Sequence, residues 1–256
     1  MTDGLINFRS VGDMAVDGGR MRGDRLYRSG HFGGLTPAAR SLVLGKAFAT
    51  VVDLRYAGER ATDLSDWPAE MADRILSHDG DRTRESPHLE LLRAGSLTVD
   101  SVDDFYHTLY AELPFDPLYR SLFAAAVERI AATPGVTLIH CSAGKDRTGI
   151  LCALILRMVG ADMADIEADY LASRHASGFA EMKRAIAARV EARYGYAVAD
   201  DALDALLGVE RAYLQATFGA IAARCGGVEP YFAQSGINAD HIAALRAWLI
   251  AKPDPE

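Results

Sequence analysis

The stretch VTLIHCSAGKDRTGILCAL, residues 136–154, constrains the fold of this chain more than any other part of it. Residues 136–140 have the apolar, β-branched character of a buried strand, and an apolar run that starts near Arg147–Thr148 predicts a helix through Val159. Between them lies a tight loop of glycine, charged and hydroxyl residues, and Cys141 stands at its start. Such a strand–loop–helix unit is typical of α/β proteins.

This loop predicts a binding site for an anion. Unpaired N–H groups gather at a helix N-terminus, and both they and the helix dipole favour negative charge. Gly144 and Gly149 allow the backbone to turn sharply. The same field favours the thiolate of Cys141, which makes this cysteine a candidate nucleophile. Arg147 follows after five intervening residues and can aim its planar guanidinium at the same anion, in the bidentate manner that suits phosphate.

The other loop residues have candidate roles around the same anion. Thr148 offers a hydroxyl to the thiolate or to a reacting oxygen, and His140 is placed to orient the loop and to favour the charged sulfur. Lys145 adds a second cation beside that of Arg147. The phosphate-binding set is therefore a run of consecutive residues: Ser142, Ala143, Gly144, Lys145, Asp146 and Arg147.

The rest of the chain predicts strands and helices in the first half and helices alone in the second. RLYRS and ATVVDL predict strands, and Thr36–Pro37 predicts the start of a helix that runs to Gly45. DPLYRSLFAAAVERIAA predicts a helix capped by Asp116, and DSVDDFYHTLYAEL predicts another. Residues 58–100 predict mostly loops. After Gly149 we expect successive helices, with breaks at Gly160, Gly178, Gly195, Gly208 and Gly226, and hence an α/β fold with a helical extension.

Composition excludes several classes of protein. The formal charge of −8 argues against a nucleic-acid surface and against a polybasic membrane anchor. The three cysteines do not predict a disulfide framework, and neither a Cys-x2-Cys pair nor clustered histidines occur, so we expect no metal and no cofactor. We find no signal peptide and no apolar run long enough to span a bilayer. We therefore expect a cytoplasmic protein, although export without a cleaved signal would leave no mark in the sequence.

The pattern Cys-x5-Arg-Thr, preceded by His140 and set between a strand and a helix, resembles the signature of the cysteine-dependent protein tyrosine phosphatases. Further segments resemble the bacterial family of mycobacterial protein tyrosine phosphatase B. They occur in the same order and span nearly the whole chain: NFRSVGD, RLYRSG, VVDLR with Glu59 beyond it, HCSAGKDRTG, ADYLASR and LGVERAYLQATF.

This resemblance implies a fold, a substrate class and a mechanism. The expected fold is a single phosphatase domain, 1–256, with a central, mostly parallel sheet flanked by helices and a helical lid within 163–207. The expected substrates are phosphotyrosine, sometimes phosphoserine or phosphothreonine, and phosphoinositides, so the partners would be phosphorylated proteins or phosphoinositides. Cys141 would attack phosphorus while Arg147 and the loop amides hold the equatorial oxygens, and water would then hydrolyse the thiophosphate.

The leaving oxygen needs a general acid, and the sequence offers more than one aspartate. The resemblance favours Asp146, as acid or as the group that positions water. Asp79 or Asp81 is the second candidate, because one of them would match an aspartate in the family's loop after the second strand. Asp66–Trp67–Pro68 has the three residues of the mobile loop of many tyrosine phosphatases in the wrong order.

Four further residues have two interpretations each. The family places residues such as Asp53 and Arg55 under the phosphate loop, although a strand-end salt bridge explains them equally well. Tyr106 and Tyr110, four residues apart, could stack on a phenyl ring or pack inward. For Lys145 we also hypothesise that its charge widens acceptance to substrates with extra phosphates.

Three functions remain open on the sequence. The first is an active phosphomonoesterase with a phosphotyrosine or a phosphoinositide preference. The second is a catalytically weak module that binds a phosphorylated ligand without turnover. The third is an oxyanion reductase, which would need a resolving cysteine, and Cys152 is the only local candidate. Intact Cys141 and Arg147 favour the first.

Overall fold

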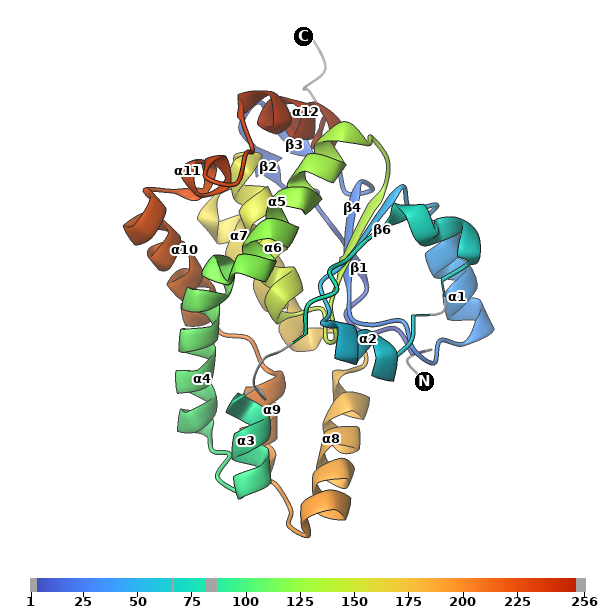
Figure 1. Cartoon of the computed structure of the whole chain (residues 1–256), viewed down its shortest axis with the longest axis vertical. Coiled ribbons are helices and arrows are strands. Elements are labelled where there is room, and N and C mark those ends of the chain that lie inside the picture. Colours follow the sequence, from blue (N-terminus) through green and yellow to red (C-terminus); the bar gives the residue numbers. More distant parts are fainter. Residues whose placement is uncertain (1–3, 66, 82–86, 252–256) are drawn as a thin grey trace.

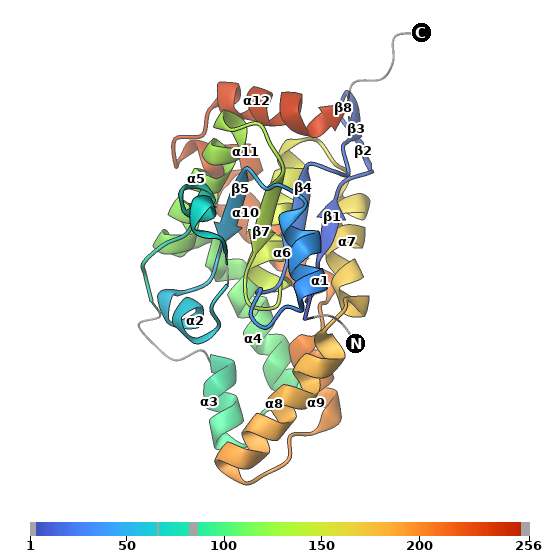
Figure 2. The same cartoon turned by 90° about the vertical axis from the view of Figure 1, so that its right-hand side faces the viewer.

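The computed structural model describes residues 4–65, 67–81 and 87–251 of the chain. A five-stranded sheet carries the predicted loop, and its strand order is β1-β4-β7-β5-β6. β4, β7, β5 and β6 run parallel, and β1 is antiparallel to β4 at the edge (Figure 2). The bounds of these strands are β1 Arg9–Val11, β4 Leu26–Ser29, β5 Thr50–Asp53, β6 Ile75–Leu76 and β7 Thr137–His140.

Both faces of this sheet are buried, as is usual for parallel sheets. Val51 and Leu138 face one apolar cluster, whereas Val52 and Ile139, their next residues, face the other. The smaller cluster lies under α1 (Pro37–Leu44), and the larger one under the helices on the opposite face of the sheet (Figure 2). This explains why the strands are continuously apolar rather than alternating.

The predicted helices α1 and α5 of the first half begin at the N-cap residues that the sequence indicates. The side chain of Thr36 accepts a hydrogen bond from Ala39 N, and α1 ends before Gly45. Asp116 caps α5 (Pro117–Ala132), as expected from its position before proline. α4 (Val99–Glu112) and the short turn η2 (Leu113–Phe115) complete this region.

The second half is helical, and its elements end at the predicted glycines. Gly178, Gly195, Gly208 and Gly226 each flank a helix end, and Gly160 separates α6 from α7. The elements are α6 Asp146–Met158, α7 Met163–Leu171, η3 Ala172–His175, α8 Phe179–Tyr194, α9 Asp200–Leu207, α10 Arg211–Cys225, α11 Val228–Ala233 and α12 Ala239–Leu249. A small second sheet joins β2 (Ala15–Val16), β3 (Gly19–Met21) and β8 (Ile250–Ala251).

The expectation of loops over 58–100 is wrong in part. This region contains α2 (Ala57–Thr62), η1 (Ala69–Arg74), β6 and α3 (Pro87–Ala94). β6 has two residues and forms because it pairs with β5, so no local apolar pattern announces it. α2 begins where the carboxylate of Glu59 accepts from the amide of Tyr56 at 2.9 Å.

The helices α3, α8 and α9 project beyond the sheet at its lower end in Figure 1. α3, α8 and α9 contact one another or the start of α4, and the predicted loop lies between them and the sheet. α7 instead packs on α6 and α10 in the main body. In the described part of the chain, no helix has both the length and the apolar character that crossing a bilayer requires.

Candidate active site

Cys141 lies where the central strand of the sheet ends. β7 leads into the loop 141–145 and α6, as the sequence predicts. In the register of the sheet, His140 pairs with Ser29 at the end of β4 and with Asp53 at the end of β5. The cysteine therefore sits between the carboxyl ends of parallel strands, where ligands of α/β proteins bind. It is 2% exposed.

The loop turns its carbonyl groups away from its centre. The carbonyl of Ser142 accepts from the amide of His31 at 3.0 Å, and that of Gly144 accepts from Asn7 Nδ2 at 2.7 Å and Arg28 Nη2 at 2.9 Å. In a trans peptide, the carbonyl and the following N–H point to opposite sides. The amides that follow these two carbonyls therefore point to the other side of the loop, as an anion cradle requires.

Three distant segments converge on the Gly144 carbonyl. Asn7 and Arg28 bind it directly, and Asp169 Oδ2 accepts from Arg28 Nη1 at 2.7 Å. Arg9 links Asn7 to Asp169, because it donates to the side-chain oxygen of Asn7 and to the backbone carbonyl of Asp169. Although burial opposes it, the charge of Asp169 raises the pKa of Arg28, so this buried side chain stays cationic. These contacts bring the three motifs NFRSVGD, RLYRSG and ADYLASR into one hydrogen-bond network around the loop.

Gly144 and Gly149 serve different purposes. Gly144 has φ +69°, and a Cβ there would lie 2.3 Å from the carbonyl carbon of Ser29, so the loop rests directly on the end of β4. The predicted sharp turn is confirmed at this glycine. At Gly149 it is wrong, because this residue lies inside α6. A Cβ at Gly149 would instead meet Tyr170 at 3.0 Å and Arg28 at 3.2 Å.

Arg147 is held at the loop by a carboxylate from α2. Its Nη1 and Nη2 donate to the two oxygens of Glu59 at 2.6 and 2.8 Å, a bidentate pair. The hydroxyl of Ser142 donates to the same carboxylate at 2.6 Å. Arg147 Nη1 also lies 3.1 Å from the Leu54 carbonyl and 3.4 Å from the Tyr119 hydroxyl. One edge of the guanidinium is thereby fixed in place.

The charges of this pair are stabilised on both sides. Burial opposes ionisation of Glu59, but the hydrogen bonds and charge of Arg147 and the Ser142 hydroxyl lower its pKa to about 2. Burial likewise opposes the charge of Arg147, and Glu59 and Cys141 nevertheless raise its pKa well above the ordinary value. Both groups are therefore ionised throughout the physiological range.

Asp53 and Arg55 form a buried ion pair beside the loop. Arg55 Nε and Nη2 donate to the two oxygens of Asp53 at 2.9 and 2.6 Å. His140 Nε2 lies 3.6 Å from the same carboxylate. Burial lowers the pKa of His140 to about 4, although Asp53 opposes the shift, so the imidazole is neutral at pH 7. Any support that His140 gives to the thiolate must therefore come without a positive charge.

The candidate general acids lie in different surroundings. Asp146 is the first residue of α6 and is 21% exposed at its side chain; its Oδ1 accepts from the Tyr110 hydroxyl at 2.8 Å. Asp79 is fully exposed and lies 3.6 Å from Arg60, on the loop after β6. Of these two aspartates, only Asp146 is part of the hydrogen-bond network around the loop. Asp66, of the Asp66–Trp67–Pro68 sequence, lies outside the described residues.

The ammonium of Lys145 is bound by the end of α9. It donates to the carbonyls of Leu206 and Gly208, both at 2.7 Å, and to the Tyr106 hydroxyl at 2.9 Å. The side chain is 2% exposed, and burial lowers the pKa of Lys145 against the opposing charges of Asp146 and Cys141. Tyr106 and Tyr110 are both buried, so of their two interpretations the inward packing is confirmed.

Two buried groups lie close behind the loop on α6. Thr148 is fully buried, and its hydroxyl has no hydrogen-bond partner within the described part of the chain, which leaves it available to a thiolate or substrate oxygen. Cys152 is also fully buried, and burial raises its pKa to about 12. A thiol so far from ionisation is poorly suited to act as a resolving cysteine.

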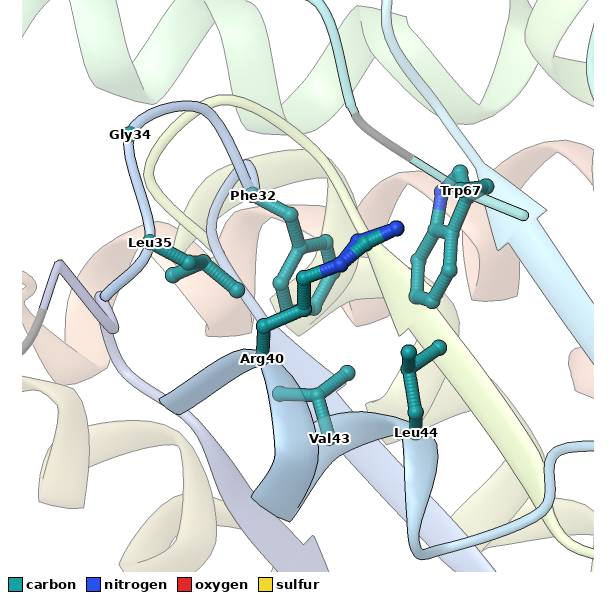
Figure 3. Close-up of a pocket in the computed structure, with 7 residues that line it drawn as sticks. All are labelled: Phe32, Gly34, Leu35, Arg40, Val43, Leu44 and Trp67. Carbon is teal, nitrogen blue, oxygen red and sulfur yellow. The ribbon is translucent and has the colours of Figure 1, made fainter. Parts of the chain in front are cut away.

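A separate apolar pocket lies on the α1 face of the sheet (Figure 3). It has a volume of about 190 Å³, and the side chain of Arg40 extends across it toward Trp67. Phe32 and Trp67 line it and also contact the ring of His140, with ring centroids 5.2 and 6.4 Å away. The pocket therefore backs onto the residue before Cys141, and the described residues that line it do not include the cysteine.

Nearly the whole chain matches known phosphatases. The model of the tyrosine phosphatase family matches residues 1–251. The chain belongs to the tyrosine phosphatase family. A protein of Cupriavidus necator named as a tyrosine-protein phosphatase is 32% identical, over 97% of this chain and 87% of that protein. The triple specificity protein phosphatase PtpB of Mycobacterium tuberculosis is 28% identical, over 96% of this chain and 97% of its own length. A tyrosine-protein phosphatase of Nostoc commune is 30% identical over 59% of this chain and 49% of that protein.

The recognised family and the α/β fold with a mostly parallel sheet are thereby confirmed, and the chain is a tyrosine phosphatase enzyme. Sequence reasoning named Glu59 only as part of a motif and missed its bond to Arg147, 88 positions along the chain. It also missed the bond of Tyr110 to Asp146 and the contact of Tyr119 with Arg147. A glutamate shortly after a strand-end Asp-x-Arg was the available signal for the first; nothing local distinguished the tyrosines.

Proposed function

We propose that this phosphatase hydrolyses phosphotyrosine esters through a cysteinyl-phosphate intermediate on Cys141. The supporting observation is the arrangement of the loop. The carbonyls of Ser142 and Gly144 point outward, Cys141 is the first residue of the loop, and Glu59 fixes Arg147 at its other end. Glu59 occupies the Nη1–Nη2 edge of the guanidinium, which leaves the Nε side for an oxygen of the substrate. Charge stabilisation by prepositioned donors of this kind is the main source of rate in phosphoryl transfer.

The reaction has two steps. The thiolate of Cys141 forms a bond to phosphorus while the bond to the tyrosyl oxygen breaks, and that oxygen takes a proton from Asp146. Water then forms a bond to phosphorus as the sulfur leaves, and its proton returns to Asp146. The hydroxyl of Thr148 is open to stabilise the sulfur in the second step. Asp79, fully exposed beside Arg60, is the weaker candidate for the acid.

The substrate range follows from the surroundings of the loop. PtpB is named for triple specificity, which supports action on phosphoserine or phosphothreonine as well. Phosphoinositide hydrolysis has less support. Lys145 would have to leave three acceptors to bind a second phosphate, and in the conformation described it contacts the end of α9 instead. We therefore place phosphotyrosine first, phosphorylated proteins as partners, and phosphoinositides as the alternative.

We also propose that α8 and α9, residues 179–207, act as a lid within one phosphatase domain. Of the residues described in α8, the buried ones are Phe179 and Val190, so this helix makes little apolar contact with the body. The end of α9 supplies the carbonyls that bind Lys145. α9 itself buries Ala202, Leu203, Leu206 and Leu207, so α8, which has few buried side chains, is the part of this lid that can open with little loss of packing.

Phosphate release from three substrates tests the proposed function. A phosphotyrosine peptide, a phosphoserine peptide and a short-chain phosphoinositide are assayed in parallel with the wild type and Cys141→Ser. Cys225→Ser is the matched control, since it makes the same chemical change on a half-buried helix end. We expect turnover of phosphotyrosine that is lost only in Cys141→Ser. Binding of all ligands by the wild type without release of phosphate would instead make the chain a binding module.

A further inference from the structure

Two tyrosines from different helices form a chain of hydrogen bonds that ends on Asp146. The hydroxyl of Tyr110, on α4, donates to Asp146 Oδ1 at 2.8 Å. The hydroxyl of Tyr170, on α7, donates to that of Tyr110, also at 2.8 Å. The order Tyr170, Tyr110, Asp146 satisfies each hydroxyl once as donor, and successive hydrogen bonds in such a chain strengthen one another.

Both phenols are protonated at neutral pH and well above it. Tyr110 is 0% and Tyr170 1% exposed. Burial, and then the negative charge of Asp146, raise the pKa of Tyr110 well above its ordinary value. The same causes, in the same order, raise the pKa of Tyr170. The two hydroxyls are therefore permanent neutral donors, and neither competes with Asp146 for the catalytic proton.

Other titratable groups near Asp146 do not replace this bond. The groups that face it come from the loop and three helices: Lys145 of the loop, Tyr106 and Tyr110 of α4, Tyr170 of α7 and Tyr213 of α10. Lys145 Nζ lies 3.8 Å from Asp146 Oδ1, beyond hydrogen-bond distance, and its donors go to the Tyr106 hydroxyl and two carbonyls. Tyr106 in turn donates to the Leu206 carbonyl.

We propose that Tyr110, supported by Tyr170, is a positioning residue for the proton transfers of Asp146. The inference rests on the proposed function, because it assigns Asp146 a part in the reaction. The phenol holds Oδ1 and so restricts rotation of the carboxylate, whose side chain is 21% exposed; the second oxygen is left to carry the proton to the leaving group and to recover it from water. A general acid held in one orientation avoids the loss of rate that follows from small misplacement.

Removing single hydroxyl groups tests this assignment. Tyr110→Phe should lower kcat on a phosphotyrosine peptide about tenfold or more, as expected for the loss of one hydrogen bond to a charged group. KM should change little, because the phosphate is bound by the loop and Arg147. The effect should be smaller on p-nitrophenyl phosphate, whose leaving group needs little protonation. Tyr170→Phe should show a weaker loss of the same kind.

The pH–rate profile gives a second readout that a purely structural role would not move. The phenol favours the ionised carboxylate, so its removal favours the protonated form. The limb of the profile that depends on Asp146 should therefore move to higher pH. Tyr231→Phe is the matched control: its hydroxyl is equally buried but donates to the Pro114 carbonyl, so the profile and kcat should stay as in the wild type.

A double-mutant cycle with Asp146→Asn decides whether Tyr110 acts through Asp146. If it does, Tyr110→Phe should have little further effect in the Asp146→Asn background. An equal loss of kcat in both backgrounds, or a Tyr110→Phe variant that matches Tyr231→Phe in kcat and in pH profile, overturns the proposal. Neither result touches the proposed function, which fails separately if Cys141→Ser retains turnover.

Discussion

Replacing Glu59 by glutamine tests how the site holds its arginine. The carboxylate accepts two hydrogen bonds from Arg147, one from the Ser142 hydroxyl and one from the amide of Tyr56. Glutamine keeps the shape but has one acceptor oxygen and no charge. Its NH2 group would face donors, so Arg147 would lose its bidentate partner and its fixed orientation.

The cost can be worked from the pKa of Glu59. A fall from the ordinary 4.5 to about 2 corresponds to about 3 kcal/mol of stability, at about 1.4 kcal/mol for each pH unit. The side chain is 28% exposed, and solvent screening reduces this value to about 2 kcal/mol. Because the folded state holds the carboxylate ionised, the contribution is complete above pH 4.5 and is lost as the pH falls toward 2.

Urea unfolding of the wild type and Glu59→Gln, at pH 7 and at intervals down to pH 4, measures this contribution. The difference in unfolding free energy should be about 2 kcal/mol at pH 7 and should begin to shrink below pH 4.5. Glu112→Gln is the matched control, because its pair with Arg224 is exposed and should contribute little to the free energy of unfolding. A difference for Glu59→Gln that stays within the control's range, or that does not depend on pH, would refute the reasoning.

Three further predictions follow from the loop and its neighbours. Burial lowers the pKa of His140 to about 4, so the contribution of its neutral imidazole to the free energy of unfolding should be complete above about pH 6.5 and should fall by up to about 3 kcal/mol toward pH 4. Urea midpoints should show this decline, and His140→Gln should flatten it. Gly144→Ala should lower the free energy of unfolding by about 3 kcal/mol or more, measured by thermal unfolding, and should abolish turnover. Gly195→Ala, at a similar positive φ but with open space around it, should cost about 1 kcal/mol. Equal costs for the two variants would contradict the steric argument. Lys145→Met should speed amide exchange in α9, residues 200–207, and unchanged exchange would show that the lid is not anchored there.

Local chemistry was enough to predict the strand, loop and helix around Cys141. Capping residues such as Thr36 and Asp116 were equally informative, because an N-cap satisfies amides only two or three positions away. The element β6 could not be predicted in the same way. Its two residues are a strand only because β5 lies beside them, and that partner is distant in sequence.

The candidate site divides along the same line. Cys141 and Arg147 were evident as candidates because five residues separate them, at the two ends of one short loop. Lys145 was expected to face the substrate, yet the fold brings the end of α9 to it, and carbonyl oxygens at a helix C-terminus attract a cation. Its neighbour Asp146 was a candidate from the sequence, but its partner Tyr110 lies 36 positions away.

The sequence by itself determined the strand–loop–helix unit around Cys141, the class of fold and the family, because these depend on residue types at short spacing and on the order of motifs. Only the tertiary structure decided which groups hold that loop in shape. Asn7, Arg28 and Glu59 reach it from other elements. Hydrogen bonds and ion pairs of this kind act over about 3 Å in space, irrespective of the distance between partners in sequence.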